Sequence, residues 1–162
     1  MAVKRWIIFL SVFALSLTAI ITLLIYFQAK QPFKEASETA ESYLVQNNLI
    51  EKVVESYPYN STNRYHTVVG ITSEGEEKAF FVPSKDTEET IMEINLADGI
   101  SKEDAISIAM AEVQGGKLLH AKLGVEEVGP VWEIAYVNQS DNLNYVYLLF
   151  ENGDWWKRIS NL

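Results

Sequence analysis

The side chains that could do chemistry in this sequence are carboxylates, two histidines and scattered serines, and there is no cysteine. His66 and His120 are far apart in the chain, and neither belongs to an HExxH motif or another paired ligand spacing. A zinc site needs three or four convergent ligands. We therefore expect both histidines to be structural, and we predict no metal site.

Ser140-Asp141-Asn142 spells the SDN triplet of penicillin-recognising enzymes. The rest of that signature is missing, because no serine is followed three residues later by a lysine and no KTG occurs. A hairpin turn, in which aspartate and asparagine bond to nearby backbone, explains the triplet better. No GxGxxG or GxxxxGK is present either, so no nucleotide cofactor is indicated.

Carboxylates are abundant, and a pair of them could hydrolyse a glycan, because glycosidase pairs are defined by their separation in space. Many of the glutamates, however, lie around predicted turns and loops: Glu74, Glu76, Glu77, Glu88, Glu89, Glu126 and Glu127. A solvated surface is the favoured interpretation. We expect no catalytic residues, and a carboxylate-based wall hydrolase remains the least favoured alternative.

The C-terminal strands carry aromatic residues that suggest binding instead. Neighbours in a strand point to opposite faces, so one residue of Trp155-Trp156 is expected to lie outside. Exposed tryptophan is a typical anchor of protein interfaces. The predicted partner-binding surface consists of Trp132, Tyr145, Tyr147, Trp155 and Trp156.

The element that positions everything else is the segment 6–27, which contains no charge, proline or glycine. As a helix it measures about 33 Å, enough to cross a hydrocarbon core of about 30 Å. Trp6 at one end, with Tyr26 and Phe27 at the other, suits the two membrane interfaces. A cleaved signal peptide is disfavoured, because cleavage after a small residue within the segment would leave too short a hydrophobic region. The sequence predicts a single-pass anchor.

Lys4 and Arg5 lie in a short tail, residues 1–5, and the positive-inside rule places this tail in the cytoplasm. The remainder is then extracytoplasmic. Without Lys4 and Arg5 it has 11 basic and 22 acidic residues, a net charge of −11. Such a charge repels nucleic acid and other polyanions.

The sequence pattern of the exported part predicts an α+β fold of two small lobes, residues 32–97 and 98–162. Each lobe is expected to be a helix packed on an antiparallel sheet. In the first lobe, helical spacing begins at Pro32 and ends at Asn47-Asn48. Predicted strands then cover residues 49–57, 64–72 and 78–82, with a turn at 58–63; residues 91–96 are of uncertain type. In the second strand, alternation places His66 on a solvated face.

The second lobe begins with Ser101 as the N-cap of a helix whose apolar face includes Met110 and Val113. Strands are predicted over residues 117–125, 131–138, 143–151 and 155–159, with turns at 140–142 and 152–153. Each lobe is too small to cover its own sheet, so we expect the two to pack together.

This arrangement, together with the motifs ISKEDA at 100–105, VWEI at 131–134 and a closing Tyr-Val-Tyr strand at 145–147, resembles the TseB (YpmB) family of Firmicutes. The second half is similar to PepSY-type domains, and the resemblance implies two cystatin- or PepSY-like lobes. It also implies a non-enzymatic regulator of cell-wall elongation that binds a class B penicillin-binding protein at the cell membrane. PepSY domains are also associated with restraint of peptidases, which is a second implied function. The resemblance brings no catalytic residues and no cofactor.

Overall fold

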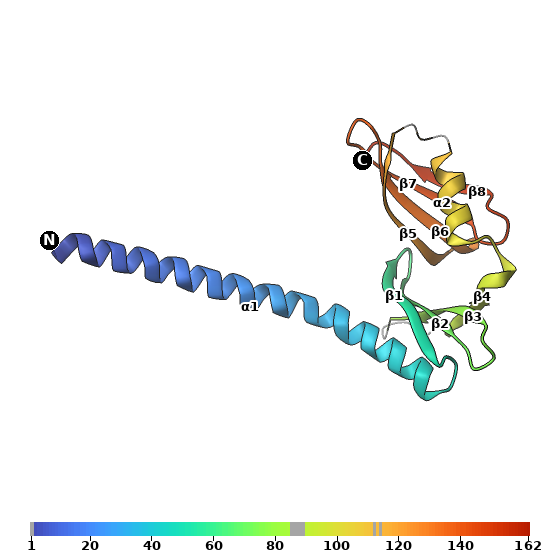
Figure 1. Ribbon diagram of the computed structural model, residues 1–162, viewed down its shortest axis with the longest axis horizontal. Coiled ribbons are helices and arrows are strands. Elements are labelled where there is room, and N and C mark those ends of the chain that lie inside the picture. Colours follow the sequence, from blue (N-terminus) through green and yellow to red (C-terminus); the bar gives the residue numbers. More distant parts are fainter. Residues whose placement is uncertain (1, 85–89, 112, 114) are drawn as a thin grey trace. The chain divides into compact units, whose positions relative to one another are not determined.

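The computed structural model describes the backbone of residues 2–84, 90–111, 113 and 115–162, and the side chains of these residues other than 2 and 29–34. By internal contacts the chain divides into two compact units, Met1–Ala36 and Ser37–Leu162. The described residues form one long helix, two four-stranded antiparallel sheets, a second helix and a short 3₁₀ turn (Figure 1). The fold is therefore α+β, as predicted.

Helix α1 covers Ala2–Gln46, and its stretch Val3–Gln28 is long and apolar enough to cross a membrane. Its apolar side chains are exposed within the structure, including Trp6, Tyr26 and Phe27. The expectation of a separate helix beginning at Pro32 was wrong, because α1 continues through this position. Gln, Ala and Lys, which fill residues 28–31, are good helix formers and supply no stop. The predicted end is confirmed, since Asn48 has a φ of 56° directly after the helix.

The first sheet has the order β1-β2-β3-β4, with β1 Lys52–Asn60, β2 Arg64–Ile71, β3 Glu77–Pro83 and β4 Met92–Asn95. β1 runs through the predicted turn at 58–63 as far as Asn60, because an edge strand tolerates Pro58. One face of the sheet contributes Val68 and Phe80 to a cluster with Ala40 and Leu44 of α1. The C-terminal end of α1 thus covers one face of this sheet.

The second sheet has the order β5-β6-β7-β8, with β5 Lys117–Glu126, β6 Gly129–Val137, β7 Leu143–Leu149 and β8 Trp155–Ile159. The 3₁₀ turn η1, Leu96–Asp98, leads into α2, Lys102–Met110, which covers one face of the sheet (Figure 1). Ser101 is confirmed as the N-cap, since its side chain accepts a hydrogen bond from the Asp104 backbone N–H. α2 ends before Val113, yet this side chain still packs on the core.

The two lobes share one hydrophobic core. The face of the first sheet opposite α1 contributes Val69, Ala79 and Phe81 to the same cluster as Ala105 of α2 and Leu123 of β5. Neither lobe therefore buries its sheet alone, as expected for units of this size. This shared core fixes the second sheet relative to the first within residues 37–162.

Candidate functional site

The candidate site lies on the face of the second sheet opposite α2. Residues paired across antiparallel strands point to the same face, and Tyr147 pairs with Glu133 on β6 and with Lys157 on β8. Tyr145 lies one step along β7 on the same face, since side chains two residues apart share a face. We call Tyr145, Tyr147 and Trp156 the aromatic face.

A β-bulge in β8 decides where the tryptophan pair points. Tyr147 pairs with Lys157 and Leu148 with Trp155, so Trp156 is an extra residue without a partner on β7. The Trp156 ring meets that of Tyr147 edge-on at 5.9 Å, and Lys157 Nζ lies 5.6 Å from each ring centroid. Trp155 is 42% exposed beside the Arg158 guanidinium, 5.6 Å from its ring. Both tryptophans therefore reach solvent, Trp156 in part.

The structure removes Trp132 from the predicted surface. Its side chain is only 5% exposed, and its indole N–H donates a 3.0 Å hydrogen bond to the Ile100 carbonyl. Trp132 pairs with Leu123 and Leu148, both of which face α2. Tyr147 is also largely covered, at 9% exposure, so its ring supports Trp156 more than it contacts solvent.

A carboxylate lies at the centre of this face. Glu133 Oε1 is 2.9 Å from His120 Nε2, and the Tyr147 hydroxyl also hydrogen-bonds to this carboxylate. Burial, followed by the charge of Glu133, raises the pKa of Tyr147, so the phenol stays protonated and acts as a donor. Tyr147 and His120 thus both engage Glu133.

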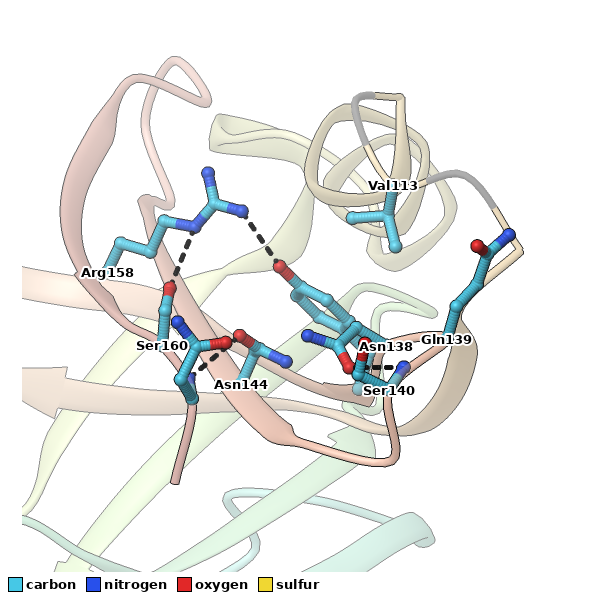
Figure 2. Close-up of a pocket in the computed structure, with 9 residues that line it drawn as sticks. Val113, Asn138, Gln139, Ser140, Asn144, Arg158 and Ser160 are labelled. Atoms are coloured by element: carbon cyan, nitrogen blue, oxygen red, sulfur yellow. Dashed lines mark hydrogen bonds between the residues drawn. The ribbon is translucent and has the colours of Figure 1, made fainter.

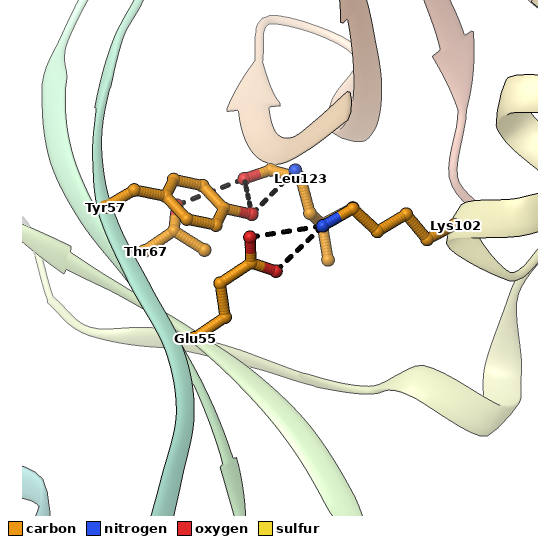
Figure 3. Close-up of polar contacts among 5 residues, drawn as sticks. All are labelled: Glu55, Tyr57, Thr67, Lys102 and Leu123. Atoms are coloured by element: carbon orange, nitrogen blue, oxygen red, sulfur yellow. Dashed lines mark hydrogen bonds and ion pairs between the residues drawn. The ribbon is translucent and has the colours of Figure 1, made fainter. Parts of the chain in front are cut away.

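The joint between the lobes is shown in Figure 3. The Tyr57 hydroxyl donates to the Leu123 carbonyl at 3.2 Å and accepts from the Leu123 N–H at 2.8 Å. Thr67 Oγ1 donates to the same carbonyl at 3.1 Å. Leu123 lies on β5, an edge strand whose backbone groups would otherwise lack partners. Side chains of the first sheet thus close an edge of the second.

Tyr59 makes a second contact at the joint. A Cβ on Gly124 would lie 2.2 Å from the Tyr59 ring, so only glycine lets this ring pack on β5. The Tyr59 hydroxyl donates to Glu126, which also accepts from Ser61, both at 2.9 Å. Glu126, expected on a solvated loop, is therefore held in the joint. Sequence reasoning missed this contact, for which the alternation of Tyr57 and Tyr59 and the lone Gly124 were the available signals.

Comparison with known proteins agrees with this architecture. Residues 35–83 match the family model described as the cell wall elongation regulator TseB-like domain. We call residues 35–83, which are similar to that domain, the TseB-like domain. The structure is similar to that of the YpmB protein from Bacillus subtilis, with a TM-score of 0.66 and 23% sequence identity, over 76% of this chain and 95% of that one. No curated protein matches the sequence.

The TseB-like domain contains a polar network beneath α1. His66 Nε2 lies 2.9 Å from Ser56 Oγ, which is 3.1 Å from Ser37 Oγ, and Ser37 donates to Glu41 at 2.6 Å. The prediction that His66 faces solvent was wrong, because β2 is buried on both faces. Burial lowers the pKa of His66, and the hydrogen bond from Ser37 lowers that of Glu41. The network ties α1 to the sheet of the TseB-like domain.

Beyond the TseB-like domain, a polar hollow of about 440 Å³ lies at one end of the second sheet (Figure 2). Arg158 crosses it, donating to the Tyr136 hydroxyl at 3.1 Å and to Ser160 Oγ at 3.2 Å. The SDN triplet forms a turn at its edge, in which the Asn138 side chain accepts from the backbone N–H groups of Ser140 and Asn142.

Among the described residues, no group of three or more His, Cys, Asp or Glu side chains could hold a metal ion. Glu88 and Glu89 lie outside the described residues. Glu74, Glu76 and Glu127 are exposed, in agreement with the expected solvated surface.

Proposed function

We propose that this protein is a non-enzymatic regulator of peptidoglycan synthesis that contacts the extracytoplasmic part of a class B penicillin-binding protein through the aromatic face. The observation that carries the proposal is the TseB-like domain, whose family is described as a cell wall elongation regulator. The fold shared with YpmB supports it. The partly exposed Trp156 and Tyr145 provide anchors of the kind that dominate binding energy at interfaces.

In this proposal the helix Val3–Gln28 anchors the protein in the cell membrane. The basic residues Lys4 and Arg5 would keep the N-terminus in the cytoplasm, so that Ser37–Leu162 lies outside. A target in the same membrane then meets this unit at a raised effective concentration. A modest interface around Trp156 and Tyr145 is sufficient under these conditions.

Site-specific photocrosslinking in living cells tests the proposal. A photoreactive amino acid at Tyr145 or Trp156 should capture a class B penicillin-binding protein, whereas the same amino acid at Glu74, on the β2–β3 turn of the other lobe, should not. Recovery of no wall-synthesis protein from the aromatic face, or equal recovery from all three positions, would refute the assigned surface. Capture of a peptidase instead would favour the restraining function that PepSY-like architecture implies.

A further inference from the structure

A groove of about 730 Å³ lies between the first sheet and the beginning of α2. Its lining is largely apolar and comprises, among others, Val54, Val69, Leu96, Ile100 and Trp132. Val54, at the bulge of β1, is 51% exposed. A groove of this volume accommodates several side chains of a bound peptide. None of its lining residues belongs to the aromatic face.

The rim of the groove is acidic. Glu55, Glu76, Glu77 and Glu103 line it, and Lys102 is the only basic residue among the described lining residues, which gives the rim a net charge of −3. Lys78 lies 3.7 Å from Glu76 of the rim and 3.6 Å from Glu93, and because the charges of Lys78 and Glu93 cancel, the net charge stays at −3 when both are counted. The groove therefore attracts cations and repels the anionic polymers and phospholipids of a cell envelope.

Lys102 already occupies part of this site. Its Nζ lies 3.0 and 3.1 Å from the two carboxylate oxygens of Glu55 and connects α2 to β1 across the groove (Figure 3). Both side chains are more than a third exposed, so the pair is weak and exchangeable. An incoming cationic group can replace Lys102 on Glu55 with little cost.

We propose that this groove binds an extended, cationic segment of a partner protein, in which arginine or lysine residues flank one apolar side chain. The apolar side chain covers Val54 and Leu96, and the basic residues pair with Glu76, Glu77 and Glu55. Charge complementarity selects this occupant over an acidic peptide. The groove uses other elements than the aromatic face, so the proposal does not depend on the function proposed above.

Fluorescence anisotropy tests the proposal with the full chain in a neutral detergent. The probe is a fluorescent ten-residue peptide in which two arginines flank one leucine in a glycine–serine background. We expect saturable binding that weakens at high salt, because the rim contacts are solvent-exposed. Replacement of both arginines by glutamate should abolish binding, and replacement of the leucine by glycine should weaken it.

Variants locate the site and separate it from general attraction to an acidic protein. Glu76→Gln combined with Glu77→Gln should weaken binding about threefold to tenfold, whereas Lys102→Gln should tighten it about twofold to fivefold by freeing Glu55. The matched control is Glu127→Gln with Glu151→Gln, which removes two exposed charges away from the groove. Absence of binding, equal losses in the control, or weaker binding by Lys102→Gln would overturn the proposal. A crosslinking failure at the aromatic face would leave these results unaffected.

Discussion

From the hydrogen bonds at the joint between the lobes we expect substitutions of Tyr57 and Thr67 to have non-additive effects on the free energy of unfolding. Both hydroxyls donate to the Leu123 carbonyl, whereas only Tyr57 accepts from the Leu123 N–H. Tyr57→Phe keeps the ring but leaves that buried N–H unpaired, which should cost about 2–3 kcal/mol. Thr67→Val leaves the carbonyl bonded to Tyr57, so it should cost only about 1 kcal/mol.

The double variant leaves both backbone groups of Leu123 without a partner. Either hydroxyl alone still donates to the Leu123 carbonyl, so the cost of leaving this carbonyl unpaired appears only when both hydroxyls are removed. We therefore expect the double variant to lose about 1–2 kcal/mol more than the sum of the single changes. Leu123 is fully buried, so water does not replace the lost bonds.

Denaturant unfolding of the full chain in a nonionic detergent, followed by tryptophan fluorescence, measures this cycle. Trp132 reports on the shared core, since it is buried and contacts Ile100. Tyr43→Phe, at an exposed tyrosine of α1, is the control and should leave the midpoint unchanged. Additive effects within about 0.5 kcal/mol, or a larger cost for Thr67→Val than for Tyr57→Phe, would refute the reasoning.

Three further outcomes are expected. Gly124→Ala should lower stability by about 1–3 kcal/mol in thermal melts, because its Cβ overlaps the Tyr59 ring, and the cost should shrink in a Tyr59→Ala background. The lowered pKa of His66 means that the unfolded chain binds its proton more readily, so stability should fall as pH drops below 6.5, and His66→Gln should flatten the profile in that window. The lowered pKa of Glu41 stabilises the folded chain above pH 4.5, so Ser37→Ala should be destabilising at pH 7. The difference from the parent chain should shrink as Glu41 becomes protonated, without vanishing, because the bond of Ser37 to Ser56 is lost at every pH.

Local signals in the sequence were sufficient for several elements. The stretch Val3–Gln28 is recognisable as a candidate membrane-spanning helix by length and apolarity alone, because a helix satisfies its own backbone hydrogen bonds. Ser101 and the turn at Asn152-Gly153 were also predictable. An N-cap and a turn depend on hydrogen bonds within a few residues of sequence. Here the Ser101 side chain accepts from the Asp104 N–H, and the Asn152 side chain accepts from the Asp154 N–H.

Tertiary structure decided which of the predicted surface residues reach solvent. Alternation gives the two faces of a strand but not which face another element covers, so His66 and Trp132 were misplaced. The orientation of Trp156 depends on a bulge in the pairing of β8 with β7, which no local pattern shows. The joint of Tyr57 and Thr67 with Leu123 spans 66 and 56 residues of sequence. Such contacts arise only once the shared core has brought the two sheets together, so residue types and spacing alone do not specify them.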